Sequence, residues 1–143
     1  MKLCVIGDPV AHSQSPALHR ALLARAGLRG TYERVRVTPE ELPRFMAAAR
    51  GGAWDGFNVT MPLKECILPL LDELEETAAA MGAVNTVVIR EGRAKGFNTD
   101  GPGFLRTLPA LPQRALVLGN GGAARAVGHA LRWAGVRVDT CCR

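Results

Sequence analysis

The chain has few aromatic residues, no long hydrophobic run and no paired-cysteine motif. Only 5% of its 143 residues are aromatic, with one tyrosine and two tryptophans, so few rings are present on which nucleic-acid bases could stack. The arginines are scattered and the formal net charge of +5 is modest, which favours small anions over nucleic acid as partners. No apolar run reaches the roughly 18 residues that cross a bilayer, so no membrane partner is expected.

The cysteines argue against disulfides and metal sites. Cys4, Cys66, Cys141 and Cys142 form no C-x-x-C pair and no metal-ligand spacing, so no metal is expected. Residues 1–7 join a basic residue to a short apolar run without a cleavage site, which favours a buried strand over a signal peptide. Reduced thiols and a cytoplasmic location are therefore expected.

Predicted strands alternate with predicted helices, which indicates an α/β fold with a mostly parallel sheet. Ser15 is expected to cap the first helix with Pro16 behind it, whereas Ser13 has no comparable structural role. The remaining patterns predict strands over 2–7, 31–37 and 55–60, helices over 15–26 and 38–49, a helical segment over 61–74 interrupted at Pro69, and a hairpin over 83–100 that turns at Glu91-Gly92.

Glycine and proline at 98–104 indicate a domain boundary. Residues 1–101 are predicted to form an N-terminal α/β domain. Residues 102–143 are predicted to form the first βαβ unit of an incomplete, Rossmann-like dinucleotide-binding domain.

A glycine-rich turn follows the strand "ALVLG". Residues 119–124, "GNGGAA", fit G-x-G-x-x-A, in which the first glycine turns the chain and the second lets the backbone approach a pyrophosphate. The amides of the following helix would face the phosphates. Arg143 favours NADP over NAD, with a terminal surface charge as the alternative reading, and Asp139 is expected at an exposed mid-strand position.

Three polar segments, 11–16, 58–64 and 82–100, interrupt the apolar pattern. In an open α/β sheet the carboxyl ends of the strands border the ligand crevice, so these segments are expected to converge there. Ser13 and Ser15 lie at a predicted helix N-terminus, where they would seat a carboxylate.

Lys64 and Asp100 are the candidates for proton transfer. A lysine at the mouth of a crevice could exchange a proton with a substrate hydroxyl, and Asp100 would orient it. Structural alternatives stand beside these roles: Lys64 as a solvated surface residue, Thr60 as a helix cap, and Asn58 and Asn85 as turn residues.

The segments "GDPVAHSQSPALH", "GFNVTMPLKE", "GAVNTVV", "GFNTDGPGF" and "VLGNGGAARA", in this order, resemble the shikimate dehydrogenase family. The similarity covers the whole chain. It implies reduction of 3-dehydroshikimate to shikimate with NADPH, on the route to chorismate and the aromatic amino acids. It also implies a substrate domain followed by a Rossmann-type NADP domain.

The resemblance assigns roles to individual residues. Reduction of a ketone by hydride leaves an alkoxide, which a cationic lysine stabilises and protonates. The resemblance implies carboxylate binding by Ser13 and Ser15, hydroxyl binding by Thr60, Asn85 and Asp100, acid/base catalysis by Lys64 with Asp100, cofactor binding by Gly119, Asn120, Gly121, Gly122 and Ala123, and contact of Arg143 with the NADP phosphate.

Two departures from the family matter. Cys142 stands where the family usually has asparagine, and the chain ends at Arg143 where family members continue. We therefore expect this 143-residue form, as an isolated monomer, to bind NADP poorly and to turn over slowly or not at all. Three alternatives remain: a quinate/shikimate dehydrogenase that uses NAD, a shikimate-binding fragment without turnover, and a generic α/β domain. The oligomeric state stays open between a monomer and a homodimer.

Overall fold

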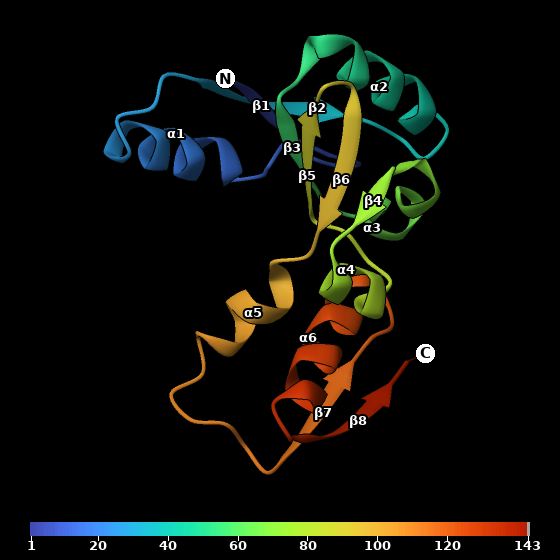
Figure 1. Cartoon of the computed structure of the whole chain (residues 1–143). Helices are drawn as coiled ribbons and strands as arrows, with labels where there is room; N and C mark the ends of the chain where they lie inside the picture. Colours follow the sequence, from blue (N-terminus) through green and yellow to red (C-terminus); the bar gives the residue numbers. More distant parts are fainter. Residues whose placement is uncertain (143) are drawn as a thin grey trace.

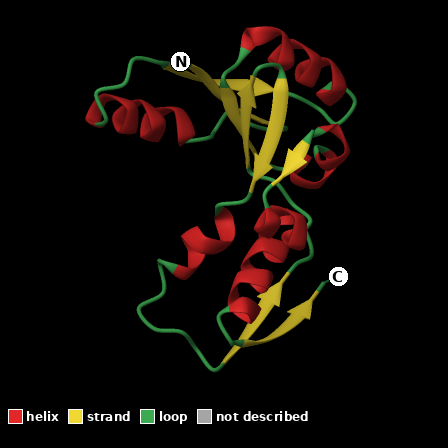
Figure 2. Ribbon diagram, in the orientation of Figure 1, coloured by secondary structure: helices red, strands yellow, loops and turns green. Residues whose placement is uncertain are grey.

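A computed structural model describes residues 1–142, which form two sheets with helices packed beside them (Figures 1 and 2). The elements follow in the order β1 (Lys2–Gly7), α1 (Ser15–Arg25), β2 (Thr31–Arg36), α2 (Leu42–Ala48) continued by a π-helical turn (Ala49–Ala53), β3 (Gly56–Val59), α3 (Leu63–Cys66), a 3-10 turn (Leu68–Leu70), β4 (Glu73–Leu74), α4 (Glu76–Met81), β5 (Thr86–Arg90), β6 (Arg93–Phe97), α5 (Asp100–Leu105), β7 (Arg114–Leu118), α6 (Gly122–Trp133) and β8 (Arg137–Cys141).

The larger sheet has six strands in the order β2-β1-β3-β5-β6-β4. β1 pairs in parallel with β2 and β3, and β4 pairs in parallel with β6. β5 runs antiparallel to β3 on one side and to β6 on the other. A tight hairpin turn joins β5 to β6. The second sheet consists of the parallel strands β7 and β8. The predicted α/β fold with a mostly parallel sheet is confirmed.

The hydrophobic core of the described residues has one main cluster and two smaller ones, of which the first joins Val5, Val10 and Tyr32. The main cluster joins the six-stranded sheet to α2 and α3, and its largest fully buried side chains are Ile6, Leu42, Leu63, Ile67, Val84 and Val87. The second small cluster joins Met81 of α4 to Ala126 and Ala130 of α6, with Leu105 of α5 packed against it. In Figure 1, α4, α5 and α6 accordingly lie together below the larger sheet.

The hairpin turn at Glu91-Gly92 is confirmed. Both residues have positive φ, 51° at Glu91 and 74° at Gly92, as a type I′ turn requires. Arg90 pairs with Arg93 directly across the turn. The paired strands extend over Thr86–Phe97, which is shorter than the predicted hairpin over 83–100.

The first helix starts differently from the sequence prediction. α1 begins at Ser15 and its N-cap residue is Gln14, so the prediction of Ser15 as N-cap is wrong. The Oγ of Ser13 accepts a hydrogen bond from the Ser15 N–H at 3.2 Å. Ser13 therefore has a structural role that was not predicted, since its hydroxyl oxygen accepts the N–H of the first residue of the helix.

The second helix is shorter than predicted. Thr38 and Glu41 make the reciprocal bonds of a capping box, from the Thr38 N–H to the Glu41 carboxylate at 2.9 Å and from the Glu41 N–H to the Thr38 Oγ1 at 3.4 Å. These bonds close a separate turn, and α2 begins only at Leu42.

α5 was not predicted, because its sequence, "DGPGFL", contains two glycines and a proline. It follows β6 directly and packs against α6. The division of the chain into domains 1–101 and 102–143 stays a prediction. Among residues 1–142, no helix combines the length and the apolar character needed to cross a membrane.

Candidate active site

Lys64 and Asp100, thirty-six positions apart, form an ion pair between Lys64 Nζ and Asp100 Oδ2. Lys64 is the second residue of α3, which follows β3, and Asp100 is the first residue of α5, which follows β6. β3 and β6 both run antiparallel to β5, so their carboxyl ends meet at the same edge of the sheet. This topology brings the two charges together. Both side chains remain partly accessible.

A buried amide holds the other oxygen of the carboxylate. Asn85 donates from Nδ2 to Asp100 Oδ1 at 2.7 Å. The Asp100 N–H donates to Asn98 Oδ1 at 2.9 Å, and Asn98 Nδ2 donates to the Ala83 carbonyl at 2.8 Å. Asn85 and Asn98 are buried, so the hydrogen bonds that fix Asp100 in place also offset the cost of burying their amides.

Asn58 is not a turn residue, and that alternative is wrong for it, whereas Asn85 lies at a bend directly before β5. Asn58 lies within β3, opposite Thr86 of β5. Its Nδ2 donates to Thr86 Oγ1 at 3.0 Å and its Oδ1 accepts from the Tyr32 hydroxyl at 2.6 Å. Asn58 and Thr86 lie in the polar segments expected at the crevice but were assigned no functional role, and Tyr32 lies outside these segments. The available signal was an amide in the middle of the otherwise apolar strand "GFNV", where an exposed turn residue is not expected.

Ser13 and Ser15 lie next to this network and not in direct contact with Lys64. Arg34 of β2 donates two hydrogen bonds to the Ser13 carbonyl, at 2.9 and 2.7 Å, and so fixes the loop before α1. Burial raises the pKa of the Tyr32 phenol, and the nearby Ser15 side chain opposes that rise. Tyr32 is therefore a neighbour of Ser15 as well as a hydrogen-bond donor to Asn58 in the sheet.

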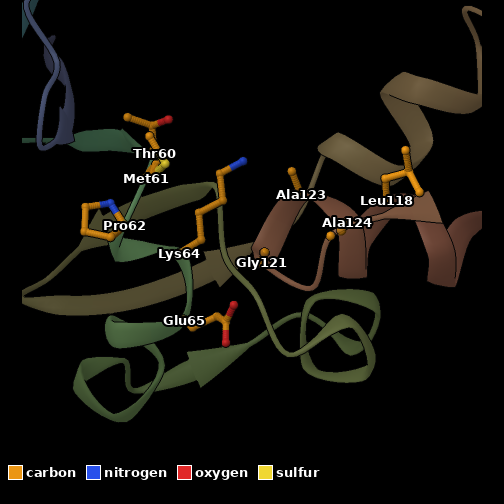
Figure 3. Close-up of a pocket in the computed structure, with 11 residues that line it drawn as sticks. Thr60, Met61, Pro62, Lys64, Glu65, Leu118, Gly121, Ala123 and Ala124 are labelled. Carbon is orange, nitrogen blue, oxygen red and sulfur yellow. The ribbon is translucent and has the colours of Figure 1, made fainter. Parts of the chain in front are cut away.

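A cavity of about 550 Å³ separates the segment from Thr60 to Glu65 from the turn between β7 and α6 (Figure 3). Lys64 lines it and extends toward the side where Gly121 and Ala123 lie. Thr60 also lines it. The Thr60 hydroxyl does not cap α3, because the Leu63 N–H bonds to the Thr60 main-chain oxygen at 2.9 Å. The helix-cap alternative for Thr60 is therefore wrong.

The opposite wall of the cavity belongs to the glycine-rich turn. Gly119, Gly121, Gly122 and Ala123 line it, whereas Asn120 does not. The Asn120 carbonyl instead accepts from Arg125 Nε at 3.1 Å. The N-terminus of α6 lies at this wall, so its free backbone amides are near the cavity.

Two glycines of this turn have opposite surroundings. A Cβ at Gly121 would meet nothing within 4 Å, whereas a Cβ at Gly122 would lie 2.9 Å from Lys64 Cβ. The walls are further joined by an ion pair between Arg125 of α6 and Glu65 of α3 at 3.3 Å. The first position leaves room for a ligand, and the second allows α6 to pack on the lysine.

β8 and the residues after it contain the positions that were considered for selecting between NADP and NAD. Asp139 is an exposed strand residue and pairs with Arg114 at 3.2 Å. Cys142 is exposed. Arg143, the predicted contact to the NADP phosphate, lies outside the described residues.

Lys64 therefore belongs to two neighbouring arrangements. On one side it joins a carboxylate and an ordered set of amides and hydroxyls. On the other side it borders a cavity whose far wall is a glycine turn at a helix N-terminus, which suits an anionic ligand. A cation in this place can stabilise a developing oxyanion and deliver a proton to it.

Comparison with known proteins places these features in a family. Residues 5–87 match the family model described as "Shikimate dehydrogenase substrate binding domain". The Exiguobacterium sp. protein named shikimate dehydrogenase (NADP(+)) is 50% identical over 134 residues, covering 92% of this chain and 51% of the relative. The chain thus spans about half the length of the curated relatives it matches.

Solved structures agree with the sequence match. The Thermus thermophilus shikimate 5-dehydrogenase in complex with shikimate superposes with a TM-score of 0.96 at 48% identity, over 100% of this chain and 56% of that one. The same enzyme in complex with NADP(H) and shikimate gives a TM-score of 0.93 at 49% identity, with the same coverage. The chain therefore belongs to the shikimate dehydrogenase family.

Proposed function

We propose that this chain forms the substrate-binding half, and the opening of the nucleotide-binding half, of an enzyme that reduces 3-dehydroshikimate to shikimate with NADPH. The observation that carries the proposal is the double position of Lys64, which pairs with Asp100 and also borders the cavity under the glycine turn. An acid/base lysine in a ketone reductase has to lie between the substrate and the hydride donor. The family's named members and their shikimate and NADP(H) complexes support the same reaction.

The chain's own residues account for the proton. NADPH, when bound, supplies the hydride to the substrate carbonyl carbon. Negative charge then develops on the carbonyl oxygen, where the Lys64 ammonium stabilises it and donates a proton. Asp100 holds the ammonium in place, and Asn85 fixes the carboxylate that does so. In the reverse direction the same pair accepts the hydroxyl proton of shikimate.

The substrate ring has polar contacts on two sides. We assign its carboxylate to Ser13 and Ser15. The Ser13 Oγ already accepts the Ser15 N–H, so its own proton is free to donate to an anion. We assign the ring hydroxyls to Thr60, Asn85 and Asp100. Since the Thr60 hydroxyl is not used as a helix cap, it can serve a ligand in the cavity that it lines.

The glycine turn fits the diphosphate of a dinucleotide. Gly121 leaves more than 4 Å of open space around the position of a Cβ, and the backbone there can approach phosphate oxygens. We assign the diphosphate to Gly119, Asn120, Gly121, Gly122 and Ala123, and the 2′-phosphate of NADP to Arg143. We also propose a cytoplasmic location, since the four cysteines are free thiols.

Calorimetric titration with shikimate tests the substrate part of the proposal. The 143-residue chain should bind shikimate, and Asp100→Asn should weaken binding because it removes the negative charge and replaces one acceptor oxygen by a donor NH₂. Asp139→Asn, an exposed carboxylate on β8, is the matched control and should bind as the unchanged chain does. Absence of binding by the unchanged chain would overturn the substrate assignment.

Turnover is tested with the chain extended to the full length of its relatives. Lys64→Ala should abolish most of the NADPH-dependent rate while changing shikimate affinity little, and an unchanged rate would remove the acid/base role. Parallel assays with quinate and with NAD separate the alternative of a quinate/shikimate dehydrogenase. Shikimate binding by the 143-residue chain without any hydride transfer would identify that form as a binding fragment. Sedimentation of the same samples decides between monomer and homodimer.

A further inference from the structure

A chain of hydrogen bonds crosses the sheet behind the active site and begins at Tyr32. The Tyr32 hydroxyl donates to Asn58 Oδ1 at 2.6 Å, and Asn58 Nδ2 donates to Thr86 Oγ1 at 3.0 Å. These residues lie on β2, β3 and β5, so the bonds connect strands that are distant in sequence. Tyr32, where this series of hydrogen bonds begins, is buried.

This series of hydrogen bonds ends on the Asp100 carboxylate. Thr86 Oγ1 donates to Asn85 Oδ1 at 2.9 Å, and Asn85 Nδ2 donates to Asp100 Oδ1 at 2.7 Å. The other oxygen of Asp100 receives the Lys64 ammonium. Every donor along the path therefore points toward the same anion.

Backbone groups fix this direction, so it does not depend on how the amide side chains are assigned. The Thr99 N–H, which can only donate, bonds to Asn85 Oδ1 at 3.0 Å. Asn85 must then turn its NH₂ toward Asp100, and Thr86 must donate to Asn85 Oδ1. The main-chain carbonyl of Asn85, which can only accept, receives a hydrogen bond from Asn58 Nδ2 at 3.2 Å. Asn58 Oδ1 is left to accept from Tyr32.

We propose that Thr86 and Tyr32 are positioning residues for the Lys64–Asp100 pair and act through this hydrogen-bond chain. Each donor in a series polarises the next, so the bond that Asn85 makes to Asp100 is stronger than it would be alone. That bond fixes which carboxylate oxygen faces Asn85 and which remains for the ammonium. The inference rests on the proposed function, because it gives these hydrogen bonds a role in positioning the acid/base pair of that reaction.

The burial of Tyr32 agrees with this role. A phenol is protonated at neutral pH, and burial raises its pKa further, so the Tyr32 hydroxyl keeps a proton to donate. Its ring stacks on His19 with centroids 4.2 Å apart. Tyr32→Phe can therefore keep the packing and remove only the donor.

The test compares two variants of Thr86. Thr86→Val keeps the shape of the side chain and removes the hydroxyl, whereas Thr86→Ser keeps the hydroxyl. A third variant, Tyr32→Phe, removes the hydroxyl at the other end of the series. The first readout is the side-chain NH₂ signals of the 143-residue chain in nitrogen–proton correlation spectra. The sequence has only four asparagines and two glutamines, so the Asn85 pair can be assigned by its loss in Asn85→Asp. The second readout is shikimate affinity by calorimetry, with thermal unfolding as the check on folding.

Thr86→Val should shift the Asn85 NH₂ signals and weaken shikimate binding about three- to tenfold, the range expected for one lost hydrogen bond. Thr86→Ser should restore both, and Tyr32→Phe should shift the Asn85 signals although it does not touch Asn85. Unmoved Asn85 signals in Thr86→Val, or equal losses in the valine and serine variants, would overturn the proposal. If the unchanged chain does not bind shikimate, the proposed function fails, and the Asn85 signals still decide whether the hydrogen-bond chain couples Tyr32 to Asn85.

Discussion

Gly122 packs directly on Lys64: a Cβ at Gly122 would lie 2.9 Å from Lys64 Cβ and 3.3 Å from Ala83 Cβ. The contact joins the first residue of α6 to the residue that pairs with Asp100. A glycine of the turn predicted to hold the cofactor thus also sets how closely that turn approaches the acid/base lysine.

Replacement of Gly122 by alanine should destabilise the fold by about 1 kcal/mol. Overpacking of a tight contact costs roughly 1–3 kcal/mol, and the better helix propensity of alanine returns up to about 1 kcal/mol. Urea unfolding of the 143-residue chain measures the change. A Gly122→Ala chain as stable as the unchanged one would mean that α3 and α6 separate without cost.

Gly121→Ala is the matched comparison, with the opposite expectation. Its φ of −73° and ψ of 174° suit any residue, and nothing lies within 4 Å of the added Cβ. Stability should therefore stay unchanged, whereas NADP affinity, measured by fluorescence titration of the chain extended to full length, should fall. Unaltered NADP affinity would contradict the assignment of the diphosphate to this turn.

Arg34→Lys should weaken shikimate binding about three- to tenfold, because lysine cannot make the two guanidinium bonds that hold the Ser13 carbonyl. Unfolding should change little, since Arg34 is exposed. Arg93→Lys is the control: it alters an exposed arginine on β6 that pairs with Glu73 at 3.1 Å. The prediction fails if calorimetry gives the two variants equal affinity.

Asp72 should make the stability of the fold depend on acidity. A hydrogen bond from the Ala94 N–H and a second from Arg50 hold the pKa of Asp72 below its usual value of 3.8. A lowered carboxyl pKa adds stability that is fully present above pH 3.8 and is lost as the pH falls through the folded-state pKa. Asp72→Asn should thus be less stable than the unchanged chain at neutral pH, and the difference should narrow below pH 3.8.

Urea unfolding of both chains across this range measures that difference. The comparison isolates Asp72, since the two chains differ at that residue alone. A difference that stays constant with pH would show that the bonds from Ala94 and Arg50 contribute nothing through the charge of Asp72.

Local chemistry allowed much of the fold to be predicted. The strand over 2–7, the turn at Glu91-Gly92 and the final strand–turn–helix–strand depend on apolar pattern and turn residues that lie next to one another in the sequence. Helix starts were less predictable. Ser15 has the features of an N-cap, but the Ser13 hydroxyl accepts its N–H and the N-cap is Gln14, one residue earlier than expected.

The candidate site was predictable only in its residue types. An isolated lysine and an aspartate at the end of a hairpin suggested an acid/base pair, and the carboxyl ends of β3 and β6 do bring them together. The turn alternative was wrong for Asn58, because asparagine is common in turns and the partner that explains this one, Thr86, lies on another strand. Asn85 does lie at a bend, but its side chain bonds to Asp100 of α5.

The sequence by itself determined most of the strands, the glycine turn before α6 and the kinds of charged and polar groups available, because these depend on neighbouring residues. Only the tertiary structure decided that Tyr32, Asn58 and Thr86 lead to Asp100, and that Gly122 rests on Lys64. The physical reason is strand order: a hydrogen bond or a close contact forms between side chains that the sheet brings within a few ångströms, whatever their separation along the chain.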